Sequence, residues 1–314
     1  MQDFQSSLPP VLHLQASPFL KNYMQVRLKA GSREGSVTHN MVRANGIDFA
    51  YLEVGEGPLV LCLHGFPDTA WAFAPVMNRM AAAGYRVVAP FMRGYPPSGL
   101  APTGDYRVIT LGHDVLALID ALGAQRAFVV GHDWGAAAAY IAAVLAPQRI
   151  ERLVAAAVPH LRRFLLWPTL RQLKRSRYMS FFQLRGVAEH RITANDFKWL
   201  RALIREWSPA WNFSDEDFGP IRAAFSDPDR LSAALGYYRA LPRDLTDPAT
   251  WRLLFTPTRI ICGANDGCIG SEMFGAQEKN FVGGFELVTM QGVGHFMHCE
   301  QPDRFAQLAL EFMR

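Results

Sequence analysis

Short apolar runs and helix-forming stretches alternate along most of the chain. Runs of the length of a buried strand occur at residues 58–63, 86–90, 127–130 and 152–158. Stretches with the composition or the spacing of helices follow the first three of these runs, at residues 71–83, 108–122 and 136–145. Upstream, residues 41–44 and 47–54 flank an Asn45-Gly46 pair, which predicts a hairpin. This alternation predicts a mostly parallel sheet covered by helices on both faces.

The alternation stops near Pro159, and residues 160–241 show helical periodicity without a convincing strand. We therefore predict a helical cap inserted after the sixth strand. The pattern then returns, with strands expected at 258–262 and 285–289 and helices expected around 271–280 and at 302–313. The predicted α/β core is thus residues 41–159 and 242–314. Residues 1–40 form an N-terminal extension, for which a poorly ordered tail and an arm packed on the core are both open.

Composition narrows the function classes. The 314 residues carry a formal net charge of +4, and 50% of them are hydrophobic, but no apolar run approaches the roughly 18 residues that span a membrane. The densest basic stretch, residues 171–177, has no aromatic ladder beside it, which favours a solvated helix face over nucleic-acid binding. The four cysteines lack zinc or redox spacing, so we expect a reducing, cytoplasmic location and no metal.

One pentapeptide, Gly131-His-Asp-Trp-Gly135, lies between a predicted strand and a helix. Small residues around an acid at such a sharp turn are typical of a nucleophile elbow, whose centre is usually serine. Here Asp133 occupies the centre, and a carboxylate that attacks carbon forms an ester. The alternative is that Asp133 only caps the following helix, but this leaves the glycines unexplained.

Hydrolysis of that ester needs a base and a group that orients it. His295 follows the last predicted strand in a glycine-flanked loop, and Asp266 follows the strand at 258–262. An ordinary Asp-Gly turn is the competing explanation for Asp266. The order nucleophile, acid, histidine is nevertheless that of the α/β-hydrolase triad. His64-Gly-Phe-Pro67 follows an earlier strand, where the backbone N–H groups of Phe66 and Trp134 would form an oxyanion hole, although a simple turn is also plausible.

These motifs resemble the α/β-hydrolase-fold epoxide hydrolases of the soluble type, over residues 41–314. The resemblance rests on the elbow, on His64-Gly-Phe-Pro67 and Met92-Arg-Gly-Tyr95, and on the cap segments Tyr178-Met-Ser-Phe-Phe-Gln183 and Gly236-Tyr-Tyr-Arg-Ala240. It implies that Tyr178 and Tyr238 act as acids on the epoxide oxygen, with Tyr237 as the nearest competitor for the second role. Core packing is the alternative explanation for both tyrosines.

The resemblance implies conversion of an epoxide to a vicinal diol through an ester on Asp133, with water as co-substrate and no cofactor. It also implies a substrate pocket, expected at His64, Phe66, Trp134, Phe181 and Leu235. A haloalkane or haloacid dehalogenase with the same nucleophile is the main alternative, although Phe66 stands where a halide-binding Asn is usual. A non-catalytic homologue is the third. No nucleic-acid partner and no membrane span are expected, and a homodimer is left open.

Overall fold

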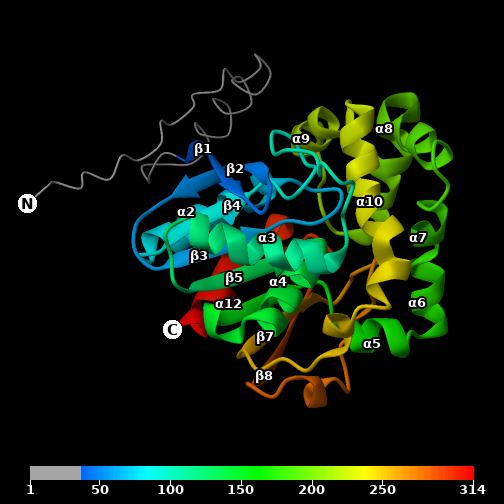
Figure 1. Cartoon of the computed structure of the whole chain (residues 1–314). Helices are drawn as coiled ribbons and strands as arrows, with labels where there is room; N and C mark the ends of the chain where they lie inside the picture. The colour runs from blue at the N-terminus through cyan, green and yellow to red at the C-terminus, as the bar shows by residue number, and fades with distance from the viewer. Residues whose placement is uncertain (1–36) are drawn as a thin grey trace, which may run out of the picture.

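The computed structural model describes residues 37–314 and contains one eight-stranded sheet (Figure 1). Its strands are β1 (Thr38–Ala44), β2 (Ile47–Val54), β3 (Leu59–Leu63), β4 (Arg86–Pro90), β5 (Ala127–His132), β6 (Ile150–Ala156), β7 (Thr258–Gly263) and β8 (Phe285–Met290). They lie in the order β1-β2-β4-β3-β5-β6-β7-β8. β2 pairs antiparallel with β1 and β4, and every other pair is parallel.

Helices cover both faces of this sheet (Figure 1). The core helices are α2 (Ala74–Ala82), α3 (Val108–Ala121), α4 (Trp134–Leu145) and α12 (Pro302–Met313), joined by the short α11 (Met297–Glu300) and the 3-10 turns η1 (Ala70–Phe73) and η2 (Pro147–Arg149). α3 packs against α4, and α2 packs against α12. Because both faces are covered, the central strands are apolar throughout; all five residues of β3 are buried.

Every regular element between β6 and β7 is helical. These elements are α5 (Leu161–Leu166), α6 (Leu170–Arg175), α7 (Arg177–Phe181), α8 (Val187–Trp207), α9 (Asp215–Phe225), α10 (Pro228–Asp244) and the 3-10 turn η3 (Pro248–Trp251). α8 is interrupted by non-helical backbone at 194–197. The helices stand together at one end of the sheet, at the right of Figure 1. The predicted fold class, with helices inserted after the sixth strand, is confirmed.

The structure differs from the sequence predictions mainly at element ends. β1 begins at Thr38 rather than Met41, because the ladder with β2 continues to the Thr38–Glu53 pair. The helix expected around 271–280 is wrong: only the 3-10 turns η4 (Ser271–Met273) and η5 (Glu278–Asn280) form there. Ala276, at a φ of 55°, breaks the helical path between them. Residues 1–36 of the expected extension lie outside the described residues.

Two further expectations concern the whole molecule. No helix within residues 37–314 is both long enough and apolar enough to cross a membrane. The division into a core at 41–159 and 242–314 and a cap at 160–241 stays a prediction. α10 runs through its second boundary and ends at Asp244.

A buried ion pair fixes the loop after β4. Arg93 donates to Asp114 of α3, with Nε–Oδ2 at 2.7 Å and Nη2–Oδ1 at 2.5 Å, and both side chains are almost fully buried. Asn45 of the first hairpin donates to the same carboxylate at 2.6 Å. The Tyr237 hydroxyl donates to the Arg93 carbonyl oxygen at 2.7 Å. The pair therefore links the hairpin, the loop, α3 and α10.

Replacing Asp114 by Ala is expected to lower the free energy of unfolding by about 3–5 kcal/mol, because it leaves the Arg93 charge buried without its partner. The measurement is equilibrium denaturation in urea. The control is Asp48→Ala, which removes an exposed ion pair with Arg43 and should cost less than about 1 kcal/mol. Equal losses in the two variants would contradict this account of the pair.

Candidate active site

Asp133 stands in a strained turn between β5 and α4. Its backbone has a φ of 50° and a ψ of −120°, a conformation that costs a non-glycine residue about 1–3 kcal/mol. A Cβ on Gly131 would lie 2.5 Å from the Gly135 carbonyl oxygen, and one on Gly135 would lie 2.1 Å from the Leu63 carbonyl oxygen. Both glycines are therefore needed for α4 to start so close to β3 and β5.

The Asp133 carboxylate does not cap α4, since it makes no capping hydrogen bond there. Instead its Oδ1 accepts a hydrogen bond from the Phe66 backbone N–H at 2.9 Å. Trp134 is the first residue of α4, where backbone N–H groups have no partner within the helix. The two predicted oxyanion-hole residues therefore flank the carboxylate, one by a direct hydrogen bond and one by its place at the helix start.

His295 lies between two carboxylates. Its Nδ1 is 2.9 Å from Asp266 Oδ2, and its Nε2 is 3.7 Å from Asp133 Oδ2. Burial alone would lower the pKa of His295, but the charges of Asp266 and Asp133 outweigh it and raise the pKa from 6.5 to about 10. The structure thus brings the three predicted triad residues together from the ends of β5, β7 and β8.

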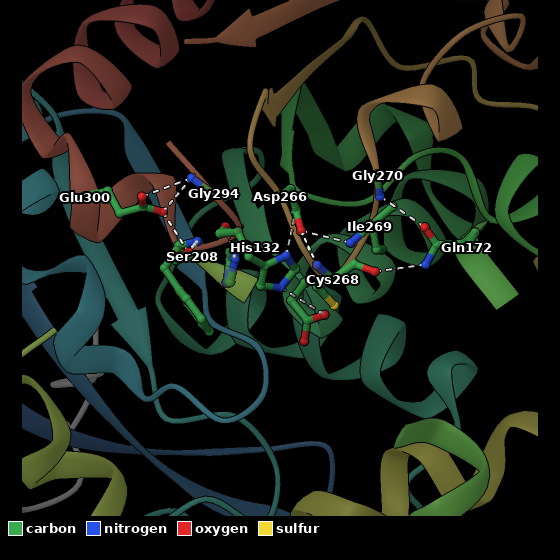
Figure 2. Close-up of polar contacts among 12 residues, drawn as sticks. His132, Gln172, Ser208, Asp266, Cys268, Ile269, Gly270, Gly294 and Glu300 are labelled. Atoms are coloured by element: carbon green, nitrogen blue, oxygen red, sulfur yellow. Dashed lines mark hydrogen bonds and ion pairs between the residues drawn. The ribbon is translucent and has the colours of Figure 1, made fainter. Parts of the chain in front are cut away.

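Asp266 is held by its own loop. Its Oδ1 accepts hydrogen bonds from the backbone N–H groups of Cys268 at 2.7 Å and Ile269 at 2.8 Å. The other oxygen is thereby left to His295 (Figure 2). This geometry orients the imidazole so that Nε2 faces Asp133.

Sequence reasoning missed the residues that brace these loops (Figure 2). The Gln172 side chain of α6 donates a hydrogen bond to the Cys268 carbonyl oxygen at 2.9 Å and accepts one from the Gly270 N–H at 3.0 Å. Glu300 accepts from the Gly294 N–H at 2.9 Å and from the Ser208 hydroxyl at 2.8 Å. Gln172 and Ser208 lie more than 90 residues from Cys268 and Glu300, the residues they bind, and Glu300, although only five residues after His295, has no motif that marks it.

A cavity opens beside Asp133 and is bordered by Tyr178 and Tyr238. The Tyr238 hydroxyl donates to no group within residues 37–314, although a hydrogen bond from the Trp134 side chain is among the influences that lower its pKa; the Tyr237 hydroxyl, by contrast, donates to the Arg93 carbonyl oxygen. The Tyr178 hydroxyl lies 3.3 Å from Cys268 Sγ. Burial raises the pKa of both Tyr178 and Tyr238 well above 10. Both phenols therefore keep their protons at neutral pH.

The predicted pocket residues are placed differently from one another. Trp134 lines the cavity beside Asp133, whereas His64, Phe66 and Leu235 are fully buried and are not among its lining residues. His64 Nε2 accepts from the Met92 N–H at 3.0 Å, which gives its ring a structural role. Phe181 lines a separate pocket between α7 and α8.

Within the described part of the chain, one group of side chains has the spacing for a metal ion: Asp68, His298 and Cys299, whose ligand atoms lie within 4.8 Å of one another. His298 Nε2 is 3.3 Å from Asp68 Oδ2. None of the three lines the cavity beside Asp133.

Comparisons with known proteins agree with this geometry. The sequence profile of the alpha/beta hydrolase fold matches residues 58–302. The chain belongs to the α/β-hydrolase fold family. Its relatives in this family include the AB hydrolase superfamily protein YfhM of Bacillus subtilis, 32% identical over 87% of this chain and 96% of that protein. Human epoxide hydrolase 4 is 31% identical over 88% of this chain and 79% of that protein.

Solved structures of the family give the same result. The crystal structure of an epoxide hydrolase from Vigna radiata superposes with a TM-score of 0.77 at 28% identity, covering 88% of this chain and 98% of that one. The resemblance to α/β-hydrolase-fold epoxide hydrolases, drawn from the motifs, is confirmed.

Replacing Asp133 by Asn is expected to lower the pKa of His295 by about 1–3 units, because a negative charge beside its Nε2 is lost. The measurement is an NMR titration of the imidazole in isotope-labelled protein. The control is Asp227→Asn, at the N-cap position of α10, which should leave the His295 pKa unchanged. An unchanged pKa in the Asp133 variant would mean that Asp266 alone sets the charge of the imidazole.

Proposed function

We propose that the chain hydrolyses epoxides to vicinal diols through a covalent ester on Asp133. The observation that carries the proposal is the Tyr238 hydroxyl, because Tyr238 borders the same cavity as Asp133 and its hydroxyl donates to no group within the described residues. A buried donor without an acceptor is costly, and an epoxide oxygen would accept its hydrogen bond. The epoxide hydrolases among the relatives support this assignment.

In the first step, Tyr178 and Tyr238 donate hydrogen bonds to the epoxide oxygen. Asp133 Oδ1 is held by the Phe66 N–H, so Oδ2 is the oxygen that attacks an epoxide carbon. A C–O bond of the ring breaks as the ester bond forms. One tyrosine then transfers its proton to the ring oxygen, which becomes a hydroxyl group. The ring centroids of Tyr178 and Tyr238 are 5.8 Å apart, so the two side chains are close enough to act on one oxygen.

In the second step, His295 removes a proton from water, and the resulting hydroxide attacks the ester carbonyl carbon. Esterification removes the charge of Asp133, which is one of the charges that raise the pKa of His295. The imidazole therefore loses its proton more readily once the ester exists. The tetrahedral oxyanion is held by the Phe66 and Trp134 N–H groups. The tyrosinate takes up the proton that the resting imidazole gives up before it acts as base. As the tetrahedral intermediate collapses, the hydroxyl group that came from water passes its proton to the departing oxygen. The diol leaves, and the Asp133 carboxylate re-forms beside a protonated His295.

A dehalogenase would use the same nucleophile, but a halide-binding Asn, whose side chain is a donor, is usual at the position of Phe66. Phe66 packs its ring against Phe182, Phe225 and Tyr238, and so presents no such donor. A panel of epoxides and haloalkanes separates the two functions by measuring diol and halide. Halide without diol would refute the proposal, and the absence of both products would favour a non-catalytic homologue.

We also propose that residues 160–241 form the cap and that 41–159 and 242–314 form the core.

Replacing His295 by Gln should stop turnover at the ester. We expect kcat to fall about 10²–10⁴-fold, since the general base is lost while Asp133 and the tyrosines remain. Mass spectrometry of the intact variant should show an added mass equal to that of the epoxide. His298→Gln is the control and should accumulate no ester. A folded His295 variant without any adduct would contradict the two-step scheme.

Replacing both Tyr178 and Tyr238 by Phe should abolish ring opening, because no acid then protonates the departing oxygen. Single-turnover ester formation is the measurement. Tyr237→Phe offers a matched control from the neighbouring position, since its hydroxyl is already engaged by the Arg93 carbonyl. Ring opening retained in the double variant, or lost equally in the Tyr237 variant, would overturn the assignment of the acids.

A further inference from the structure

A second carboxyl group lines the cavity beside Asp133. Asp244, the last residue of α10, is only 2% exposed and borders this cavity with Asp133 and Tyr238. Much of the remaining wall is apolar and includes Val108, Val158, Leu161, Phe164, Leu165 and Leu241. The steps at Asp133 use neither oxygen of Asp244. A buried ionisable group at a reaction cavity without an assigned task is a candidate for substrate recognition.

Only half of this carboxyl group is used by the protein. Asp244 Oδ1 accepts a hydrogen bond at 2.9 Å from the N–H of Val108, the first residue of α3. The Asp244 carbonyl oxygen accepts from the hydroxyl of Thr250, which also lines the cavity, at 2.8 Å. Asp244 Oδ2 has no hydrogen-bond partner within residues 37–314.

Capping α3 accounts for Oδ1 but not for Oδ2. An asparagine, serine or threonine would supply one acceptor for the Val108 N–H without burying a second acidic oxygen. Burial, the largest influence, raises the pKa of Asp244 to about 7, against the lowering effects of the Val108 hydrogen bond and the Arg107 charge. Near neutral pH both forms of the group are therefore present. In the carboxylate form Oδ2 is an acceptor, whereas in the neutral form the proton lies on Oδ2, because Oδ1 accepts from Val108. A substrate donor at Oδ2 would favour the carboxylate form.

We propose that Asp244 Oδ2 accepts a hydrogen bond from the substrate, so that the preferred epoxides carry a hydroxyl group, or a similar donor, away from the ring. This inference rests on the proposed function and adds a substrate class to it. In a largely apolar cavity, one acceptor at a fixed place selects strongly, because a substrate without the donor leaves the acceptor buried and unpaired. Asp244 acts here in specificity and takes no part in bond making.

The test compares two epoxides that differ only in this donor, 5,6-epoxyhexan-1-ol and its methyl ether. The wild-type protein should favour the alcohol in kcat/KM by about tenfold or more. Asp244→Asn keeps an oxygen for the Val108 N–H and presents an N–H donor in place of Oδ2. The alcohol-to-ether ratio should therefore fall to about one or reverse in this variant. Asp244→Ser, which can also accept from Val108, should lose the preference as well.

Asp227→Asn is the matched control, since Asp227 also caps a helix, by accepting from the Asp229 N–H, but does not line the cavity. It should keep the wild-type ratio. An equal loss on both substrates in the Asp244 variants, with the ratio unchanged, would overturn the inference and leave Asp244 as a link between α10 and α3. Thermal unfolding of each variant shows whether the fold is retained.

The two proposals fail in distinguishable ways. If the wild-type protein produced no diol from either compound, the proposed function would fail. The role of Asp244 would then be measured by equilibrium binding of the unreactive pair hexan-1-ol and 1-methoxyhexane to the wild-type protein and to Asp244→Asn. An alcohol-to-ether affinity ratio that is the same in both proteins would refute the inference, and a ratio that drops in the variant would support it.

Discussion

The close approach of α4 to the central strands is the constraint on which the site depends. Gly131 and Gly135 leave no room for a Cβ, so α4 begins directly over β3 and β5. Asp133 is forced into a positive φ at this point, and its carboxylate is turned away from its own helix. It meets the Phe66 N–H instead, on the loop that follows β3. The strain at one residue thus brings the Asp133 carboxylate to its neighbouring donor.

The electrostatics of the site follow from placing one imidazole between two acids. Asp266 is fixed by two backbone N–H groups, and it holds His295 from the side opposite Asp133. Both acids raise the pKa of the imidazole, although its burial opposes them. Only the charge of Asp133 changes during the proposed reaction. The proton affinity of His295 would therefore fall when the ester forms, which is the step at which a base is needed.

The helical segment contributes chemistry by burying polar groups without satisfying all of them. Phe66, Trp134, Phe182 and Tyr238 form one aromatic cluster over the nucleophile. Burial in this cluster raises the pKa of Tyr238 well above its ordinary value, and the Tyr238 hydroxyl donates to no group within the described residues. Asp244 Oδ2, on the cavity wall, has no hydrogen-bond partner among these residues. A polar substrate in this cavity would provide hydrogen-bond partners for both groups.

The sequence by itself determined the alternation of strands and helices, the elbow and the chain order of Asp133, Asp266 and His295. These features are local, because apolar periodicity and paired glycines act on adjacent residues. The sequence also picked Tyr238 over Tyr237, but only by its likeness to a motif, whereas the Tyr237–Arg93 hydrogen bond supplies a physical reason. The helix that the sequence predicted at 271–280 does not form, because the positive φ of Ala276 interrupts the helical path there.

Only the tertiary structure decided which side chains border the cavity. His64, Phe66 and Leu235 were expected there and are instead packed in the core, while Asp244 and Thr250 were not expected and line the wall. The sequence also did not predict the hydrogen bonds by which Gln172, Ser208 and Glu300 hold the loops of the site. The hydrogen bonds from Gln172 to Cys268 and from Ser208 to Glu300 join residues 96 and 92 positions apart, whereas the one between Gly294 and Glu300 spans six. Their partners are set by how helices pack over the sheet, and no local sequence pattern records that packing.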